Sequence, residues 1–201
     1  MRVIAGRYKG RRLKSPPGLD VRPTPDRLKE SLFNILQDRL PGSRFLDLCA
    51  GTGSAGIEAL SRGATFVLFV ERSRAAVAVL RENLRALNII EGYDVYCGDA
   101  LVALEQLIER GDRFDIVFFD PPYASNLYEP VMSCLGGGEV LAPGGILIVM
   151  HHRKMSLEPL YGVLERTRQV IQGENVLSFY VISPEPDSRV APERGHRDGE
   201  P

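Results

Sequence analysis

The sequence predicts an α/β fold in which a mostly parallel, doubly wound sheet is flanked by helices. Short apolar and β-branched runs alternate with longer segments of helical period along most of the chain. A glycine-rich loop follows the first run, as is usual at the ligand-binding edge of such sheets. Only residues 172–175 separate the last two runs, too few for a helical crossover but enough for a hairpin. We therefore expect a seven-stranded sheet whose last strand is antiparallel.

The individual elements follow from periodicity and from their end signals. The first helix is expected to begin at Thr24 and Pro25, a favoured N-cap and a favoured first helical residue, and to run to about Leu40. Strands are expected at residues 44–48, 65–70, 93–97, 114–119, 145–151, 166–171 and 176–183. The remaining helices are expected at residues 53–62, 74–87, 101–110, 127–135 and 157–164.

The composition fits one domain with a basic start and a polar tail. A chain of 201 residues that is 44% hydrophobic can bury one sizeable core, which we place in residues 21–183. Residues 1–20 form a basic N-terminal arm in front of it. Residues 184–201 contain four prolines and no aromatic residue, so we expect this tail to be disordered.

Cysteine usage and hydropathy restrict the class of protein. Cys49, Cys97 and Cys134 lie far apart and form no CxxC pair, so we expect neither a metal site nor a disulfide framework. No apolar run is long enough to cross a bilayer, and the first residues lack the apolar region of a signal peptide. No element has an apolar face larger than the core requires. We therefore expect a soluble, cytoplasmic monomer that binds no metal.

Gly51, Gly53 and Gly56 match the GxGxxG pattern directly after the first strand. A dinucleotide would place its pyrophosphate at the following helix N-terminus, where the Asp47 carboxylate would repel it. S-adenosylmethionine carries an amino acid and a sulfonium in place of phosphate, so Asp47 is compatible with that cofactor. A tight turn without a ligand is the alternative interpretation.

Two further acids follow the second and third strands. Glu71 can accept hydrogen bonds from both ribose hydroxyls of a cofactor, although nicotinamide enzymes use the same device. Asp99 is placed to accept from an adenine amino group, but it could instead be a helix N-cap. An acid at the end of three successive strands is typical of methyltransferases. The predicted cofactor-binding residues are Asp47, Ala50, Gly51, Thr52, Gly53, Glu71, Asp99 and Ala100.

The fourth strand opens into Asp120, Pro121, Pro122 and Tyr123, which we predict to be catalytic. Two prolines remove two backbone donors, so the carbonyl groups here can face a ligand. If the Asp120 carboxylate and the Pro121 carbonyl accept hydrogen bonds from the two N–H groups of an aromatic amine, the nitrogen lone pair is localised and aimed at a methyl donor. Tyr123 offers a face for stacking an extruded base. Alternatively, the prolines only stop the strand and Asp120 caps a turn.

With these residues, the chain resembles the class I methyltransferases, and more narrowly the RsmD-type ribosomal RNA guanine-N2 methyltransferases. The narrower resemblance rests on short segments in the first third of the chain. These are residues 2–6 together with 10–13, residues 22–27, residues 32–34 and residues 60–64. It implies a Rossmann-like fold, S-adenosylmethionine as cofactor, and methylation of a guanine N2 in 16S rRNA on the assembling or assembled small ribosomal subunit. Cys49, Thr52 and Arg72-Ser73 depart from the family pattern, but the carboxylates and glycines are retained.

The basic arm favours a nucleic acid over a small substrate, because clustered cations gain affinity by releasing phosphate counterions. We expect it to fold as a β-hairpin that lies along RNA; a solvated terminus without a partner is the alternative. The predicted RNA-binding residues are Arg2, Arg7, Lys9, Arg11, Arg12, Lys14, Arg22 and Arg27.

Three other functions are compatible with parts of the sequence. A DNA adenine-N6 methyltransferase could use the same tetrapeptide, but such enzymes usually carry a target-reading domain for which this chain has no room. A nicotinamide oxidoreductase would leave Asp99 and the tetrapeptide unexplained. A non-catalytic RNA-binding module would not need Asp120 and Tyr123. His151 and His152 end the fifth strand, and we assign them no catalytic role.

Overall fold

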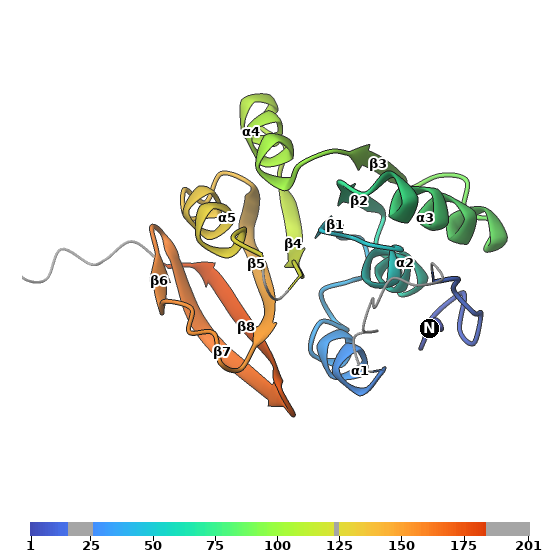
Figure 1. Cartoon of the computed structure of the whole chain (residues 1–201), viewed down its shortest axis with the longest axis horizontal. Coiled ribbons are helices and arrows are strands. Elements are labelled where there is room, and N and C mark those ends of the chain that lie inside the picture. The colour runs from blue at the N-terminus through green and yellow to red at the C-terminus, as the bar shows by residue number, and fades with distance from the viewer. Residues whose placement is uncertain (16–25, 123–124, 184–201) are drawn as a thin grey trace, which may run out of the picture.

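The computed structural model describes residues 1–15, 26–122 and 125–183, which form one sheet with helices on both faces (Figure 1). The helices are α1 (Asp26–Ile35), α2 (Ser54–Ser61), α3 (Arg74–Ala86), α4 (Ala100–Arg110) and α5 (Tyr128–Leu135). The strands are β1 (Arg44–Leu48), β2 (Phe66–Glu71), β3 (Tyr93–Cys97), β4 (Phe114–Phe119), β5 (Leu141–His152), β6 (Leu160–Tyr161), β7 (Leu164–Gln172) and β8 (Asn175–Ile182). Within these ranges, no helix has the length and apolar character that a bilayer span requires.

The strand order in the sheet is β3-β2-β1-β4-β5-β8-β7-β6. The first five strands pair in parallel, whereas β8 lies between β5 and β7 and is antiparallel to both. The predicted Rossmann-like sheet with an antiparallel last strand is therefore confirmed, with the two-residue β6 as an eighth strand. The order reverses between β1 and β4, and in open α/β sheets the ligand crevice forms at such a switch point.

The helix expected at residues 157–164 is wrong. The segment forms β6 and a turn, and β7 begins at its last residue. Pro159 cannot donate a helical hydrogen bond. Gly162 has a φ of +55°, and a Cβ atom there would lie 2.2 Å from the carbonyl oxygen of Gly136 at the end of α5. A close approach between distant parts of the chain, which periodicity does not reveal, therefore sets the conformation of this segment.

The first helix is shorter than expected, because α1 ends at Ile35 and turns follow. Leu36 and Leu40 are nevertheless fully buried, so the predicted apolar face extends past the helix. Thr24 and Pro25, the expected start of the helix, lie outside the described residues. The other helices and strands occur where the periodicity predicts them, although β5 starts four residues earlier than expected.

Each face of the sheet supports a hydrophobic core. On one face α1, α2 and α3 pack against side chains such as Phe45 and Phe69, and residues of the N-terminal arm join this core. On the other face α4 and α5 pack against side chains such as Phe119 and Tyr180. Burial of both faces explains why the central strands are continuously apolar rather than alternating.

Residues 1–15, called the arm from here on, fold back on themselves and pack against α2 and α3 (Figure 1). Arg2 and Arg12 form an antiparallel bridge, and the Val3 amide donates to the Arg11 carbonyl at 3.0 Å. Val3 and Leu13 are buried in the first core. The arm thus has the antiparallel pairing of the expected hairpin, although neither side is long enough to form a strand.

Candidate active site

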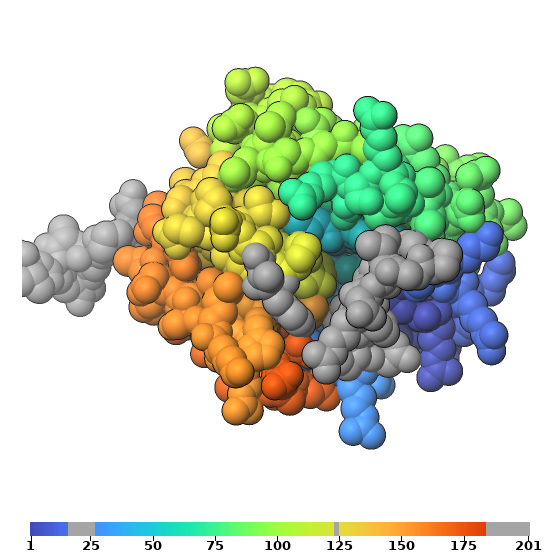
Figure 2. All heavy atoms as spheres, viewed as in Figure 1, coloured from blue at the N-terminus to red at the C-terminus, as the bar shows by residue number. Residues whose placement is uncertain are grey.

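A cavity of about 750 Å³ opens at the carboxyl ends of β1, β2, β3 and β4. Figure 2 shows the recess from outside, between α3 and the segment that leads into α5. Apart from Gly53, every predicted cofactor-binding and catalytic residue that the structure describes lines this cavity. These residues are Asp47, Ala50, Gly51, Thr52, Glu71, Asp99, Ala100, Asp120, Pro121 and Pro122. Tyr123 lies outside the described residues.

The three glycines of the GxGxxG segment after β1 have different roles. A Cβ atom on Gly53 would lie 2.1 Å from Leu80 of α3, and one on Gly56 would lie 2.2 Å from the ring of Phe69 in β2. These two glycines therefore allow α2 to pack closely against its neighbours. Gly51, with a φ of +55°, has nothing within 4 Å of the corresponding position and borders the open cavity. Only Gly51 leaves space that a ligand could use.

Asp47 lies beneath this loop and is 2% exposed. Its Oδ2 atom accepts a hydrogen bond from the Gly56 amide at 2.8 Å, which fixes the start of α2. Burial raises the pKa of Asp47 to about 7, and the negative charge of Glu71 adds to this shift, while the bond from Gly56 opposes it. A cation bound in the cavity would favour the ionised form of Asp47.

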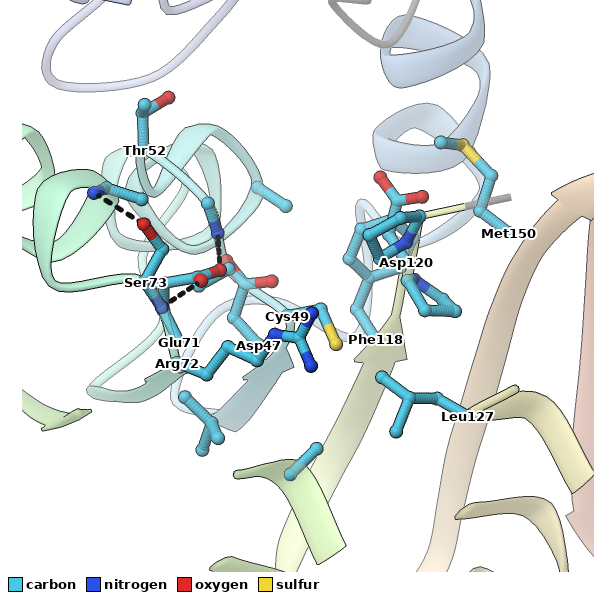
Figure 3. Close-up of a pocket in the computed structure, with 18 of the residues that line it drawn as sticks. Asp47, Cys49, Thr52, Glu71, Arg72, Ser73, Phe118, Asp120, Leu127 and Met150 are labelled. Atoms are coloured by element: carbon cyan, nitrogen blue, oxygen red, sulfur yellow. Dashed lines mark hydrogen bonds between the residues drawn. The ribbon is translucent and has the colours of Figure 1, made fainter. Parts of the chain in front are cut away.

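Glu71, the last residue of β2, holds the two segments that flank the cavity mouth (Figure 3). Its Oε2 atom accepts from the Gly51 amide at 2.8 Å, and its Oε1 atom accepts from the Ser73 amide at 2.7 Å. Each carboxylate oxygen can accept a second hydrogen bond. Glu71 therefore organises the cavity mouth and keeps acceptor capacity for the ribose hydroxyls that the sequence interpretation assigned to it.

Asp99 is the N-cap of α4, because its Oδ1 atom accepts from the Leu101 amide at 2.8 Å. The N-cap alternative raised from the sequence is therefore confirmed. Asp99 also lines the cavity beside Ala100, so its second oxygen can still serve a ligand. Recognition of an adenine amino group by Asp99 stays a prediction.

Asp120 follows β4 and lies on the opposite side of the cavity from Glu71 and Arg72 (Figure 3). Its main-chain amide donates to the Leu48 carbonyl at 3.3 Å, which holds the carboxylate beside the end of β1. Burial, with a contribution from the charge of Asp47, raises the pKa of Asp120 to about 8. Near neutral pH, this carboxyl group can therefore both accept hydrogen bonds and exchange a proton.

Cys49 lies between the two sides of the cavity and has a left-handed backbone, with a φ of 64°. Burial and the neighbouring carboxylates raise the pKa of its thiol to about 12, although Arg72 opposes the shift. The thiol is therefore protonated at neutral pH and is a poor nucleophile. The geometry favours chemistry without a covalent cysteine intermediate.

The model of a protein family described as Conserved hypothetical protein 95 matches residues 1–181 of this chain. The chain belongs to this family.

Proteins similar to this family member carry methyltransferase names. Ribosomal RNA small subunit methyltransferase D of Haemophilus influenzae is 39% identical over 150 residues, which are 74% of this chain and 77% of that protein. The Escherichia coli protein of the same name is 32% identical over 184 residues, 90% and 89% of the two chains. The solved structure of Escherichia coli yhhF has a TM-score of 0.79 at 28% identity and covers 92% of this chain and 99% of that chain. The present member of the Conserved hypothetical protein 95 family is a methyltransferase, as its motifs predicted.

The cavity of this methyltransferase also includes residues that the sequence analysis did not select. Arg72 extends its guanidinium across the cavity toward Cys49 (Figure 3), and its position directly after Glu71 could have revealed it. Lys29 of α1 also lines the cavity, although its side chain is only 4% exposed. A lysine on an otherwise apolar helix face was the available signal. Met150, one residue before the buried His151, borders the cavity beside Asp120 (Figure 3).

The predicted RNA-binding residues that the structure describes do not line the cavity. The six cationic residues of the arm and Arg27 on α1 are all exposed, whereas Arg22 lies outside the described residues. Within the arm, Arg11 donates to the Ala86 carbonyl and Lys14 forms an ion pair with Glu82 at 2.9 Å. These two cations therefore help to hold the arm on α3. The other cations of the arm are Arg2, Arg7, Lys9 and Arg12.

Proposed function

We propose that this methyltransferase uses S-adenosylmethionine to methylate the exocyclic N2 of a guanine in 16S rRNA, within the assembling or assembled small ribosomal subunit. The observation that carries the proposal is the position of Asp120 across one cavity from Glu71 (Figure 3), with Pro121 next to Asp120 in the chain and Gly51 hydrogen-bonded to Glu71. Asp120 and Pro121 form what we call the acceptor wall, which offers hydrogen-bond acceptors for an amine. The cofactor wall carries Gly51 and three acids that suit a nucleoside cofactor, namely Asp47, Glu71 and Asp99.

The chemistry of the cavity lining fits this cofactor. Gly51 borders open space, and Glu71 and Asp99 both present carboxylates there. We assign Glu71 to the ribose hydroxyls, Asp99 and Ala100 to the adenine end, and residues 49–53 with Asp47 to the amino-acid end. S-adenosylmethionine would supply an electrophilic methyl group on a positively charged sulfur. Asp47 and Asp120 are negative when ionised, so they complement that charge.

The acceptor wall can orient and deprotonate an aromatic amine. Pro121 is buried and Pro122 exposed, and neither has an N–H that competes for the carbonyl groups of the segment. The Asp120 carboxylate and the Pro121 carbonyl accept hydrogen bonds from the two N–H groups of the amine, which localises the lone pair on nitrogen. Because the pKa of Asp120 is raised to about 8, its carboxylate is basic enough to take the proton that the nitrogen loses after transfer. Tyr123 is assigned to stack on the extruded base.

The choice of small-subunit rRNA rests on the relatives and on the arm. The Haemophilus influenzae and Escherichia coli relatives are named ribosomal RNA small subunit methyltransferases. The exposed cations of the arm supply sequence-independent affinity for phosphates, which suits a large RNA better than a free nucleoside. The tetrapeptide would serve an adenine N6 equally well, so the preference for guanine N2 rests on the family resemblance.

The decisive experiment measures transfer of labelled methyl from S-adenosylmethionine to small subunits purified from a strain that lacks the enzyme. Naked rRNA is tested in parallel, and the products are digested to nucleosides and separated. We expect N2-methylguanosine, mainly on the assembled particle, because we assign the choice of target to the shape of the RNA and to its protein context. Formation of N6-methyladenosine, or no transfer to either RNA, would overturn the guanine assignment and direct the search to DNA.

A further inference from the structure

Two buried side chains each connect the arm to residues that line the cavity. We propose that one of them, Asn83, is a positioning residue that couples the arm to the cofactor loop, defined as residues 49–53. Binding of the cofactor then stabilises the arm, and binding of substrate by the arm strengthens cofactor binding. The inference rests on the proposed function for the identity of the cofactor and for the role of the arm.

Asn83 lies on α3 and is 1% exposed. Its Oδ1 atom accepts from the Lys14 amide at 2.8 Å, and its Nδ2 atom donates to the Lys14 carbonyl at 3.2 Å. The same Nδ2 atom donates to the Thr52 carbonyl at 3.0 Å. One side-chain amide therefore binds the main chain of the arm on one side and the main chain of the cofactor loop on the other.

The three contacts of Asn83 make the two segments interdependent. All three partners are backbone groups, so the contacts depend on where each chain segment lies and not on a side-chain rotamer. Thr52 is 3% exposed and lines the cavity, so a ligand that fixes the loop also fixes the carbonyl that orients the Asn83 amide. Once the side-chain amide of Asn83 is held in one orientation, it loses less conformational entropy when it also binds the main chain of Lys14. Leaving the deeply buried Asn83 amide without partners costs free energy, so its bonds to Lys14 and Thr52 tend to be kept together or lost together.

A second connection at the other end of the arm supports the same coupling. The Lys29 ammonium donates to the Arg2 carbonyl at 2.9 Å and to the Ser54 hydroxyl at 3.1 Å, and it lies 3.7 Å from Glu58 Oε2. Ser54 directly follows the cofactor loop and lines the cavity. The fully buried Glu58 carboxylate in turn accepts the Ile4 amide at 2.8 Å. Both ends of the arm are thus connected to the cavity wall through buried polar groups.

Ser61 provides a matched control, because it holds the arm without contacting the cofactor loop. Its hydroxyl accepts from the Tyr8 amide at 3.0 Å and donates to the Ala5 carbonyl. Ser61 is 4% exposed and is not part of the cavity wall. Ser61→Ala and Asn83→Ala therefore both remove buried hydrogen bonds to the arm, but only Asn83→Ala also releases the Thr52 carbonyl.

Amide hydrogen exchange of the full chain with and without S-adenosylhomocysteine tests the coupling without RNA. The reporters are the Val3 and Leu13 amides, which donate within the arm to Arg11 and Met1 and keep these partners in both variants. In the wild type we expect S-adenosylhomocysteine to slow their exchange by about five-fold or more, the lower end of typical coupling between sites. In Ser61→Ala the same amides should exchange faster both with and without S-adenosylhomocysteine, but the ratio of the two exchange rates should equal that of the wild type. Asn83→Ala should bind S-adenosylhomocysteine and yet show a clearly smaller ratio, because only the connection through Lys29 remains.

A second variant guards against a general loss of structure in Asn83→Ala. Asn83→Asp keeps the shape and the acceptor for the Lys14 amide but loses the donors to Lys14 and Thr52, so we expect the ratio to fall to a similar extent here. An unchanged exchange rate in the wild type despite S-adenosylhomocysteine binding would overturn the coupling alone, as would a full ratio in both Asn83 variants. Failure of the wild type to bind S-adenosylhomocysteine in calorimetry would instead contradict the proposed cofactor, and the inference with it.

Discussion

The two walls of the cavity use their carboxylates in different ways. On the cofactor wall, Asp47, Glu71 and Asp99 each accept a main-chain amide at 2.7 to 2.8 Å. On the acceptor wall, the Asp120 carboxylate accepts no hydrogen bond from the described residues. The cofactor wall is therefore built partly by its acids, whereas Asp120 contributes acceptors that the described residues do not use.

This difference predicts which acid serves chemistry and which serve structure. Desolvation of a carboxylate that accepts no hydrogen bond from the described residues is unfavourable, which agrees with the raised pKa of Asp120. Folded proteins usually satisfy such groups, and exceptions concentrate at functional sites. None of the described residues donates to the Asp120 carboxylate, and an amine substrate would bring such donors. The acids of the cofactor wall, by contrast, cannot be removed without disturbing the loops they hold.

The largest expected effect is that of Asp120→Ala on turnover. Loss of both the acceptor and the base should lower kcat by at least about a thousandfold, since each contribution is commonly worth two or more orders of magnitude. Affinity for S-adenosylhomocysteine should change by no more than about two-fold by calorimetry, because no bond of the cofactor wall is lost. Asp120→Asn, which keeps the shape and one acceptor, serves as the control and should retain more activity than Asp120→Ala. An equal loss of turnover and cofactor affinity would show that Asp120 is structural.

Glu71→Gln should show the opposite pattern, with a smaller effect. The amide keeps one acceptor but turns an NH₂ group toward the Gly51 or the Ser73 amide, so the loop loses a charged hydrogen bond. Such bonds are worth about 1.5 to 3 kcal/mol, which corresponds to roughly 10- to 100-fold in cofactor affinity. Calorimetry measures that loss, and single-turnover rates at saturating cofactor should remain within a few-fold of wild type. A large fall in the saturated rate would mean that the two walls do not divide the work as proposed.

Periodicity and strand-end chemistry were sufficient for the region that forms the cavity. The strands β1 to β4 and the loops after them were predicted within about a residue, because parallel strands buried on both faces are apolar and end in distinctive polar residues. The segment 157–164 was not, because Gly162 approaches Gly136 in a tertiary contact that leaves no periodic signal. Local sequence therefore predicted the parallel half of the sheet better than the β6–β7 corner.

The same limit applies within the site. Glu71 and Asp120 could be found because they directly follow apolar runs and their residue types suit the expected ligand. Asn83 could not be found, because on a helix face it resembles any polar residue, and its partner Lys14 is 69 positions away. Asp99 illustrates the remaining case, since the sequence allowed both a cap and a ligand and the structure places it where it can be both.

The raised pKa values of Asp47 and Asp120 predict a dependence of stability on pH. Both groups have a pKa near 3.8 when unfolded, and about 7 and about 8 in the folded protein without ligand. Between these values the folded state binds more protons than the unfolded state, so the free energy of unfolding should fall as pH rises from about 4 to about 8. Urea unfolding across this range measures the slope, and Asp120→Asn should make it shallower. A slope unchanged by this substitution would show that Asp120 is ionised throughout and already stabilised in the fold.

The smallest expected effects separate the two roles of Asp99. Asp99→Ala should lower the free energy of unfolding by about 1 kcal/mol, the usual cost of losing an N-cap, whereas Asp99→Asn should retain that stability because asparagine caps equally well. Both variants remove the carboxylate assigned to the adenine amino group, so both should weaken S-adenosylhomocysteine binding by a similar factor, about ten-fold for one charged hydrogen bond. Urea unfolding and calorimetry on the same samples distinguish these effects. If the Asp99→Asn variant bound the cofactor as tightly as the wild type does, Asp99 would be a cap that only borders the cavity, and the cofactor wall would recognise adenine through other groups.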